Sequence, residues 1–333
     1  MDENKNVIIL LNTGKDDGTV KLTNQQNYYL NKALQKAGLF HIDLYEENVL
    51  SELDLNGLRN APAVKTKIRS LISQRADIAW KMEQWEQSGI YILTLLDENY
   101  PQNLLNKLAD KAPAVIYGLG NKQNLTDAGI AIVGSRDIDD EIVEKTQQIA
   151  RQLVENGANI ISGGAQGVDL TAMQAALEHG GNVIGFLKQT FSFKNLSQSG
   201  WNRFLEDGNL TLLTEIAPDE KQDRKMIIAS AMNRNKYLYA LAEYGIIIAS
   251  DVKGGTWQGA EEQLLKFGNN IFVVDHEMND KKGNKKLITE LGALPLPDIN
   301  ENLLESMTDN YNAWLKNKDN KIHRDTQIEI SFD

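Results

Sequence analysis

Two glycine-rich turns constrain the fold more than any other feature of the sequence. Each follows a short apolar run and opens into a segment with helical spacing: AIVGSR at residues 131–136 and IISGGAQGVDL at residues 160–170. A third apolar run, NVIGFL, follows at residues 182–187. Apolar runs that alternate with helices are typical of consecutive βαβ units, so the sequence predicts a parallel sheet. Such sheets bind ligands at the carboxyl ends of their strands, where both turns are expected to lie.

The residues of these turns predict an anion site. In the first turn, Gly134 permits a tight bend, Ser135 offers a hydroxyl, and Arg136 places a guanidinium beside the next helix N-terminus. The second turn has small side chains that leave its peptide N–H groups open to a ligand. The alternative is that these glycines only allow a strand to pack closely against a helix. The candidate contacts in the second turn are Ser162, Gly163, Gly164 and Gly167.

The spacing of the glycines disfavours two common nucleotide sites. Neither turn has the GxGxxG spacing of dinucleotide-binding proteins, and GxxxxGK[ST] does not occur in the sequence. A nicotinamide enzyme and a P-loop ATPase are therefore not expected.

Later segments extend the same predicted sheet. Helices are predicted at residues 139–155, 169–179, 224–243 and 257–267, and further strands at residues 210–214, 245–250 and 270–274. Six strands with intervening helices would complete a doubly wound α/β sheet. A cationic RNK triplet lies inside the helix before the fifth strand, where it either contacts phosphates and bases or forms a solvated face. The candidate contacts from these later segments are Lys188, Arg234, Asn235, Lys236, Gly255 and Thr256.

Three parts are predicted along the chain. Residues 1–90 are expected to form a small helical domain, with helices at residues 28–37, 52–56 and 64–87. Residues 91–307 would form the sheet domain, and strands near residue 91 and at residues 114–117 would begin it. Residues 308–333 would form a polar tail. The basic segment at residues 63–72 either contacts a DNA backbone or is the solvated face of an ordinary helix.

Composition excludes several classes of protein. The 333 residues contain no cysteine, which excludes disulfides, thiolate catalysis and cysteine-based zinc sites, and the four histidines are scattered. No metal or cofactor is therefore expected. The run VIILLN at residues 7–12 is too short for a signal segment, and no run approaches membrane-spanning length, which favours a cytoplasmic protein. The net charge of −11 disfavours bulk attraction to nucleic acid but allows a local basic groove.

Five motifs in order resemble the DNA-processing protein A family (DprA, also called Smf). They are GSR at 134–136, SGGAQGVDLTA at 162–172, RNK at 234–236, GGT at 254–256 and GNKKLITELGALPL at 283–296. The resemblance covers about residues 28–307. It implies an extended Rossmann-like fold after a helical domain of sterile-alpha-motif type. It also implies a non-enzymatic homodimer that binds single-stranded DNA and helps to load the RecA recombinase in transformation or recombination.

The resemblance carries the DNA contacts over to the turns and the RNK triplet named above, and leaves Trp257, Phe191 and Phe193 available to stack on bases. This chain departs from the family at three places. The usual RNR triplet is RNK, which loses one guanidinium fork, and Gln166 stands where an arginine is common. The predicted tail stands where many members continue into a winged helix.

Two other interpretations stay open at this point. The segment KGGTWQGAEE at residues 253–262 partly resembles the site of the lysine-decarboxylase-like phosphoribohydrolases, in which Glu261 or Glu262 would act as acid or base. A nucleotide-binding or nucleotide-hydrolysing protein is therefore the alternative function. The polar tail and acidic composition are also compatible with a sensor in a defence system.

Overall fold

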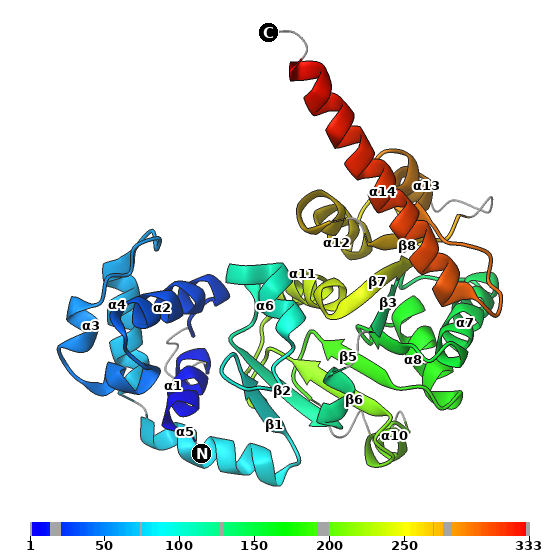
Figure 1. The fold of residues 1–333 in the computed structure, drawn as a ribbon. Coiled ribbons are helices and arrows are strands. Elements are labelled where there is room, and N and C mark those ends of the chain that lie inside the picture. Colours follow the sequence, from blue (N-terminus) through cyan, green and yellow to red (C-terminus); the bar gives the residue numbers. More distant parts are fainter. Residues whose placement is uncertain are drawn as a thin grey trace. The chain divides into compact units, whose positions relative to one another are not determined.

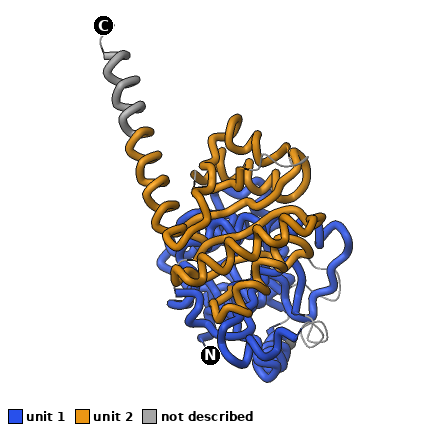
Figure 2. The backbone as a smooth tube through the Cα atoms, turned by 90° about the vertical axis from the view of Figure 1, so that its right-hand side faces the viewer, with its two compact units in different colours: residues 1–127, 184–241 blue, residues 128–183, 242–333 orange. Residues whose placement is uncertain are grey.

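The computed structural model describes residues 2–13, 21–73, 75–126, 129–191, 200–268, 270–275 and 282–330. The chain divides into two compact units, coloured separately in Figure 2: residues 1–127 with 184–241, and residues 128–183 with 242–333. Within the described ranges, a nine-stranded sheet has its strands in the order β1-β2-β6-β5 in the first unit and β4-β3-β7-β8-β9 in the second.

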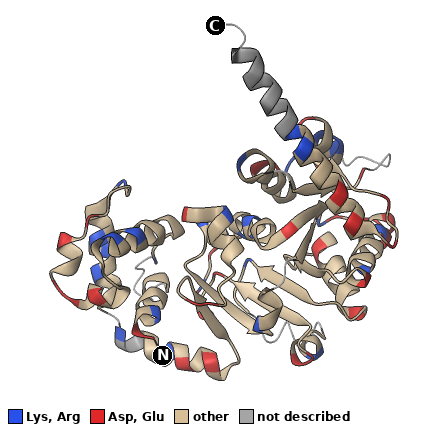
Figure 3. Cartoon of the chain, viewed as in Figure 1, with Lys and Arg blue, Asp and Glu red and all other residues tan. Residues whose placement is uncertain are grey.

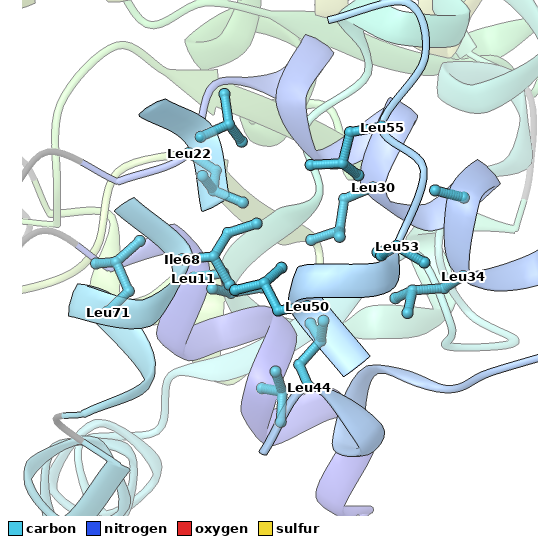
Figure 4. Packing of buried hydrophobic residues seen from close by; sticks show 13 residues of the cluster. Leu11, Leu22, Leu30, Leu34, Leu44, Leu50, Leu53, Leu55, Ile68 and Leu71 are labelled. Atoms are coloured by element: carbon cyan, nitrogen blue, oxygen red, sulfur yellow. The ribbon is translucent and has the colours of Figure 1, made fainter. Parts of the chain in front are cut away.

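The first unit begins with helices that close on a leucine-rich core. These are α1 (Glu3–Asn12), α2 (Asn24–Ala37), η1 (His41–Tyr45), α3 (Val49–Glu52), α4 (Ala61–Ile72) and α5 (Arg75–Gln87) (Figure 1). The apolar faces of the first four α-helices meet in one cluster that includes Leu11, Leu30 and Ile68 (Figure 4). The run at residues 7–12, considered above only as a signal segment, lies within α1, and its Val7 and Leu11 belong to this core. The predicted helical region is therefore present.

Two predicted helices in this region differ from the structure. Residues 64–87 were expected to form one helix, but α4 ends at Ile72 and α5 begins at Arg75. The Ser73 hydroxyl donates to the Ser70 carbonyl at 2.8 Å, a local bond that competes with the helical backbone. The helix predicted at 52–56 is also wrong, because α3 ends at Glu52 and Gly57 adopts a φ of +101°.

The first unit also holds four strands and the helices between them. They are β1 (Tyr91–Thr94), α6 (Gln102–Leu108), η2 (Ala109–Lys111), β2 (Val115–Gly120), η3 (Lys122–Leu125), β5 (Val183–Leu187), α10 (Asn202–Glu206), β6 (Leu210–Thr214) and α11 (Arg224–Leu241). β1 pairs with β2, and β2 with β6, in antiparallel register. The Tyr100 hydroxyl donates to the Pro113 carbonyl at 2.5 Å and ties the segment after β1 to the start of β2.

The second unit is a parallel α/β layer. It contains β3 (Gly129–Val133), α7 (Asp140–Glu155), β4 (Asn159–Ser162), α8 (Val168–Glu178), β7 (Ala242–Ile247), α12 (Gly255–Glu262), the π-helical turn η4 (Gln263–Phe267), β8 (Ile271–Val273), α13 (Lys282–Thr289), β9 (Leu294–Pro295) and α14 (Leu303–Ile330). The β3/β4, β3/β7, β7/β8 and β8/β9 pairs are all parallel. Every residue of β3 and β4 is buried, as expected for strands covered on both faces.

The predicted fold class is confirmed: the protein is an α/β chain with an extended Rossmann-like, mostly parallel sheet after a small helical domain. The strand predicted at 210–214 matches β6, whereas the strand predicted at 245–250 forms at Ala242–Ile247. Residues 237–250 are buried on both sides of this helix-to-strand change, with Glu243 as the one exception, so periodicity could not fix the boundary. The two compact units follow a different division from the one at 90/91 and 307/308, which stays a prediction. Most of the predicted tail lies in α14.

Candidate functional site

The first glycine-rich turn lies between β3 and α7 in the second unit. A Cβ at Gly134 would come within 2.6 Å of the Val168 side chain, so only glycine lets the turn approach α8 this closely. The Ser135 amide donates to the Ala249 carbonyl at 2.8 Å, and the Ser135 hydroxyl donates to the Asp137 carbonyl at 2.9 Å. Arg136 is exposed. The turn is therefore fixed by its main chain, while the guanidinium faces solvent.

The second turn packs directly on the first. Gly167 has a φ of +90°, and a Cβ there would lie 2.4 Å from the Ser135 carbonyl oxygen and 2.7 Å from the Arg136 Cα. The Val168 amide, at the start of α8, donates to the same Ser135 carbonyl at 3.1 Å. One N-terminal amide of α8 is thus used to hold the two turns together. Gly164, with a φ of +65°, shapes the same turn.

The third turn joins the same group from α12. The Thr256 hydroxyl donates to the Gly134 carbonyl at 2.9 Å, and Gly254 precedes α12 with a φ of +99°. The predicted contacts Gly134, Ser135, Arg136, Gly163, Gly164, Gly167, Gly255 and Thr256 therefore all lie on turns of the second unit that meet around the end of β3.

Asn284, on α13, fixes the neighbouring strand ends. Its amide nitrogen donates to the Ile248 and Val274 carbonyls, both at 2.8 Å, and its oxygen accepts the Ser250 amide at 2.7 Å. A Cβ at the preceding Gly283 would lie 2.3 Å from the Ser250 carbonyl oxygen. Asn284 was not singled out from the sequence. The Gly-Asn pair that opens the GNKK motif was the signal that could have identified it.

Ser162 has a different position from the other turn residues. It is 0% exposed, and its hydroxyl donates to the Ile132 carbonyl of β3 at 2.7 Å. The side chain of Ser162 thus holds β4 against β3 in this conformation. Its assignment as a ligand contact stays a prediction.

The remaining predicted cations and amide belong to the first unit. Arg234 is 5% exposed in the interior of α11, whereas Asn235 and Lys236 are half-buried on the same helix. The triplet is therefore not the solvated helix face that was the alternative interpretation. Lys188 is half-buried directly after β5. None of these four residues is placed relative to the turns of the second unit.

The two aromatic candidates that the structure describes are both at least half-buried. Trp257 is half-buried in the first turn of α12, and Phe191 is 8% exposed. Phe193 lies outside the described residues.

The carboxylates of the hydrolase interpretation lie on an ordinary helix surface. Glu262 accepts the Lys266 ammonium at 3.2 Å, one turn further along the chain, and Glu261 is half-buried beside it. Both glutamates are half-buried, and pairing with a lysine at i+4 is a common interaction of a helical glutamate. This geometry does not favour the nucleotide-hydrolysing alternative.

Metal-binding groups and membrane spans are both lacking in the described part of the chain. No group of three or more His, Asp or Glu side chains converges there as metal ligands would. No helix among the described residues combines the length and apolar character needed to cross a bilayer.

Together, the fold and the site define an α/β protein with glycine-rich turns gathered at the carboxyl end of a parallel strand. A model of the family described as DNA recombination-mediator protein A matches residues 91–307, more than half of the chain. The chain belongs to the DNA recombination-mediator protein A family. The predicted resemblance is thereby confirmed.

Two curated relatives have the same family names. DNA processing protein DprA of Streptococcus pneumoniae is 28% identical over 271 residues, which cover 78% of this chain and 90% of that protein. Protein Smf of Borreliella burgdorferi is 27% identical over 186 residues, which cover 55% of this chain and 57% of that protein.

Two solved structures are similar to this fold. The X-ray structure of DNA processing protein A from Streptococcus pneumoniae has a TM-score of 0.63 at 21% identity and covers 86% of this chain and 99% of its own. DNA processing protein A from Helicobacter pylori, whose structure concerns its single-stranded DNA binding mode, has a TM-score of 0.56 at 26% identity. That match covers 66% of this chain and 96% of the Helicobacter chain.

Proposed function

We propose that this protein binds single-stranded DNA without catalysing a reaction, and acts as a recombination mediator. One observation carries the proposal: the glycine-rich turns of a family member are tied together around Gly134, beside the exposed Arg136. The single-stranded DNA binding described for the Helicobacter pylori relative supports this choice of ligand.

The chemistry of the turns suits a phosphodiester. Glycine turns let the backbone approach a phosphate closely, and helix N-termini such as that of α8 carry a partial positive charge. The Arg136 guanidinium supplies a charge-assisted contact that fixes a phosphate without reading its base. On this proposal the remaining predicted contacts, Lys188, Arg234, Asn235 and Lys236, supply further cations and an amide from the first unit.

The test is a titration of the purified chain into fluorescent oligothymidylate at two salt concentrations, with duplex DNA of equal length as the control. We expect preference for the single strand and an affinity that falls as salt rises. Arg136→Ala should weaken binding by about tenfold or more, because a hydrogen bond to a charged group is lost. Arg151→Ala is the matched control, since Arg151 is an exposed arginine at the far end of α7.

Two results would contradict the proposal. Equal affinity for duplex and single strand would remove the ligand class. Binding unchanged by Arg136→Ala would remove the turns as its site.

The family's wider behaviour is proposed in the same terms. The chain is expected to form a homodimer, to act in the cytoplasm and to assist a RecA-type recombinase. Light scattering on the purified chain tests the dimer. Strand-exchange assays, in which RecA competes with a single-strand-binding protein, test the recombinase step by its rate with and without this protein.

A further inference from the structure

A cationic surface lies on α2, which belongs to the first unit. Residues 21–42 contain three lysines and no acidic residue, in a chain whose net charge is −11. Lys32 and Lys36 are both exposed, and their i, i+4 spacing places them on one face of α2. Figure 3 shows the blue of lysine along α2 without red. The positive charge of this helix comes from Lys32 and Lys36, because Lys21 precedes α2 and pairs with Glu220 at 2.8 Å.

Lys67 of α4 extends the surface. Its ammonium donates to the Gln26 side-chain oxygen at 3.2 Å, so α4 contacts the first turn of α2. Residues 55–76, which include α4, contain five cations and no acidic residue. Partial burial lowers the pKa of Lys67 from its ordinary value, and a bound anion would reverse that shift.

Two pairs of these cations have the like-charge spacing that disfavours a helix. Lys32 and Lys36 are like charges at i, i+4 on α2, and Lys65 and Arg69 repeat this spacing on α4. Each such pair destabilises a helix by about 0.2–0.5 kcal/mol. A polyanion lying along α2 would remove this repulsion.

The first turn of α2 lies beside α11, the helix that holds the RNK triplet. The Asn24 amide nitrogen donates to the Tyr237 hydroxyl at 3.0 Å and to the Lys111 carbonyl at 3.2 Å. The Tyr237 hydroxyl in turn donates to the Glu215 carboxylate at 2.6 Å. Tyr237 is 1% exposed, so a buried contact joins the two helices within the first unit. Lys36 then lies about 18 Å along α2 from Asn24, at 1.5 Å per residue.

We propose that Lys32, Lys36 and Lys67 form an accessory contact for the phosphate backbone of single-stranded DNA, continuing from α11 along α2. This inference rests on the proposed function and names a second part of the strand's path. Lys32 is held over the Tyr28 ring, with its ammonium 4.6 Å from the ring centroid. The contact is electrostatic and independent of sequence, because it reaches the backbone and not the bases.

The test compares the triple variant Lys32→Gln, Lys36→Gln, Lys67→Gln with a control of equal charge change, Lys145→Gln, Arg151→Gln, Lys316→Gln, on α7 and α14. A single-strand-binding module covers about 4–16 nucleotides. An oligothymidylate of about 6 nucleotides lies near the lower end of this range, and one of about 30 nucleotides extends beyond it. For the long strand, we expect the triple variant to bind about tenfold more weakly, with a salt slope shallower by about 2, or about 0.7 per lost phosphate contact. For the short strand, we expect it to bind like the wild type.

Any other outcome overturns the inference, and the pattern of binding shows whether the proposed function fails with it. If the wild type binds no single strand, the proposed function fails and the inference fails with it. If the wild type binds and the triple variant matches it on the long strand, only the accessory contact is wrong. Equal weakening by the control variant, or on the short strand, would show a general charge effect. Because Lys67 is half-buried, the double variant Lys32→Gln, Lys36→Gln, with two exposed sites, checks that folding is unaffected and should give about two thirds of the change in slope.

Discussion

The two units hold their candidate contact regions together with different kinds of bonds. In the second unit, the turns are held by main-chain bonds, such as that from the Val168 amide to the Ser135 carbonyl, and by glycines that leave no room for a Cβ. In the first unit, the contact of α11 with α2 depends on side chains, through Tyr237, Glu215 and Asn24. A region held by its backbone should therefore lose stability when a methyl group is added. A region held by side chains should lose stability when a hydroxyl or a charge is removed.

The largest effect is expected at Gly167. In Gly167→Ala the new Cβ would meet the Ser135 carbonyl oxygen at 2.4 Å, at a φ of +90° that L-residues rarely adopt. Backbone strain and the clash together should lower the free energy of unfolding by about 3 kcal/mol or more and separate the first two turns. Chemical denaturation measures the first effect, and oligothymidylate titration measures the loss of binding.

Gly157→Ala is the matched control for this variant. Gly157 has a comparable φ of +81°, but no atom lies within 4 Å of the position that a Cβ would take there. It should show only the backbone strain, about 1–2 kcal/mol, and bind DNA like the wild type. Equal destabilisation of the two variants would mean that the close approach of the turns contributes nothing.

Removal of one hydroxyl tests the first unit. Tyr237→Phe deletes the donor to Glu215 and the acceptor for Asn24, so the free energy of unfolding should fall by about 2–3 kcal/mol, because a bond to a charged group is lost. Tyr100→Phe removes a bond to a neutral carbonyl from an equally buried ring and should lower it by only about 1 kcal/mol. If both variants lose the same amount, the Glu215 contact has no special weight.

A pH change tests the first unit in another way. Burial lowers the pKa of His41 from 6.5 to about 4. Between these values the unfolded chain binds a proton that the folded chain does not, so stability falls as the pH drops below about 6.5 and levels off below about 4. From pH 7 to pH 5 this loss should be about 2 kcal/mol.

The measurement compares the free energy of unfolding of wild type, His41→Gln and His179→Gln at pH 7 and pH 5. The His41 variant should lose about 2 kcal/mol less on acidification, while the variant of the exposed His179 should follow the wild type. A pH response unchanged by His41→Gln would show that carboxylates alone determine the acid sensitivity.

Much of the fold could be predicted because its strands are short apolar runs bounded by glycine. β3, β4 and β5 each stand within two residues of the predicted run. The periodicity of apolar residues did not predict the break between two helices whose buried residues follow one continuous pattern. The buried residues of α4 and α5 continue a single helical phase through Ile68, Leu71 and Ile78, so the break after Ser73 could not be seen. The two-residue strand β9 is too short to leave a periodic signal.

Less of the candidate site could be predicted, because residue type does not say which way a group points. The glycine spacing correctly located the turns, but Ser135 was singled out for a hydroxyl that donates to the Asp137 carbonyl, and Ser162, named only as a small turn residue, has a hydroxyl that donates to the Ile132 carbonyl. Asn284 was overlooked because a single asparagine can bond to two strand ends only when the fold brings the ends of β7 and β8 beside it. Such roles depend on contacts between distant segments, which spacing along the chain does not encode.

The smallest expected effect tests whether the backbone-built turns can use an added charge. Gln166 is exposed in the second turn, at the position where the family resemblance implies an arginine. Gln166→Arg should tighten single-strand binding severalfold and steepen the salt slope by about 0.7, the value for one added phosphate contact. Gln148→Arg adds the same charge on the exposed face of α7 and should leave the slope nearly unchanged. If both variants steepen the slope equally, net charge and not the position of the turn determines affinity. If neither does, the strand does not pass the second turn, and the cationic helices of the first unit become its main site.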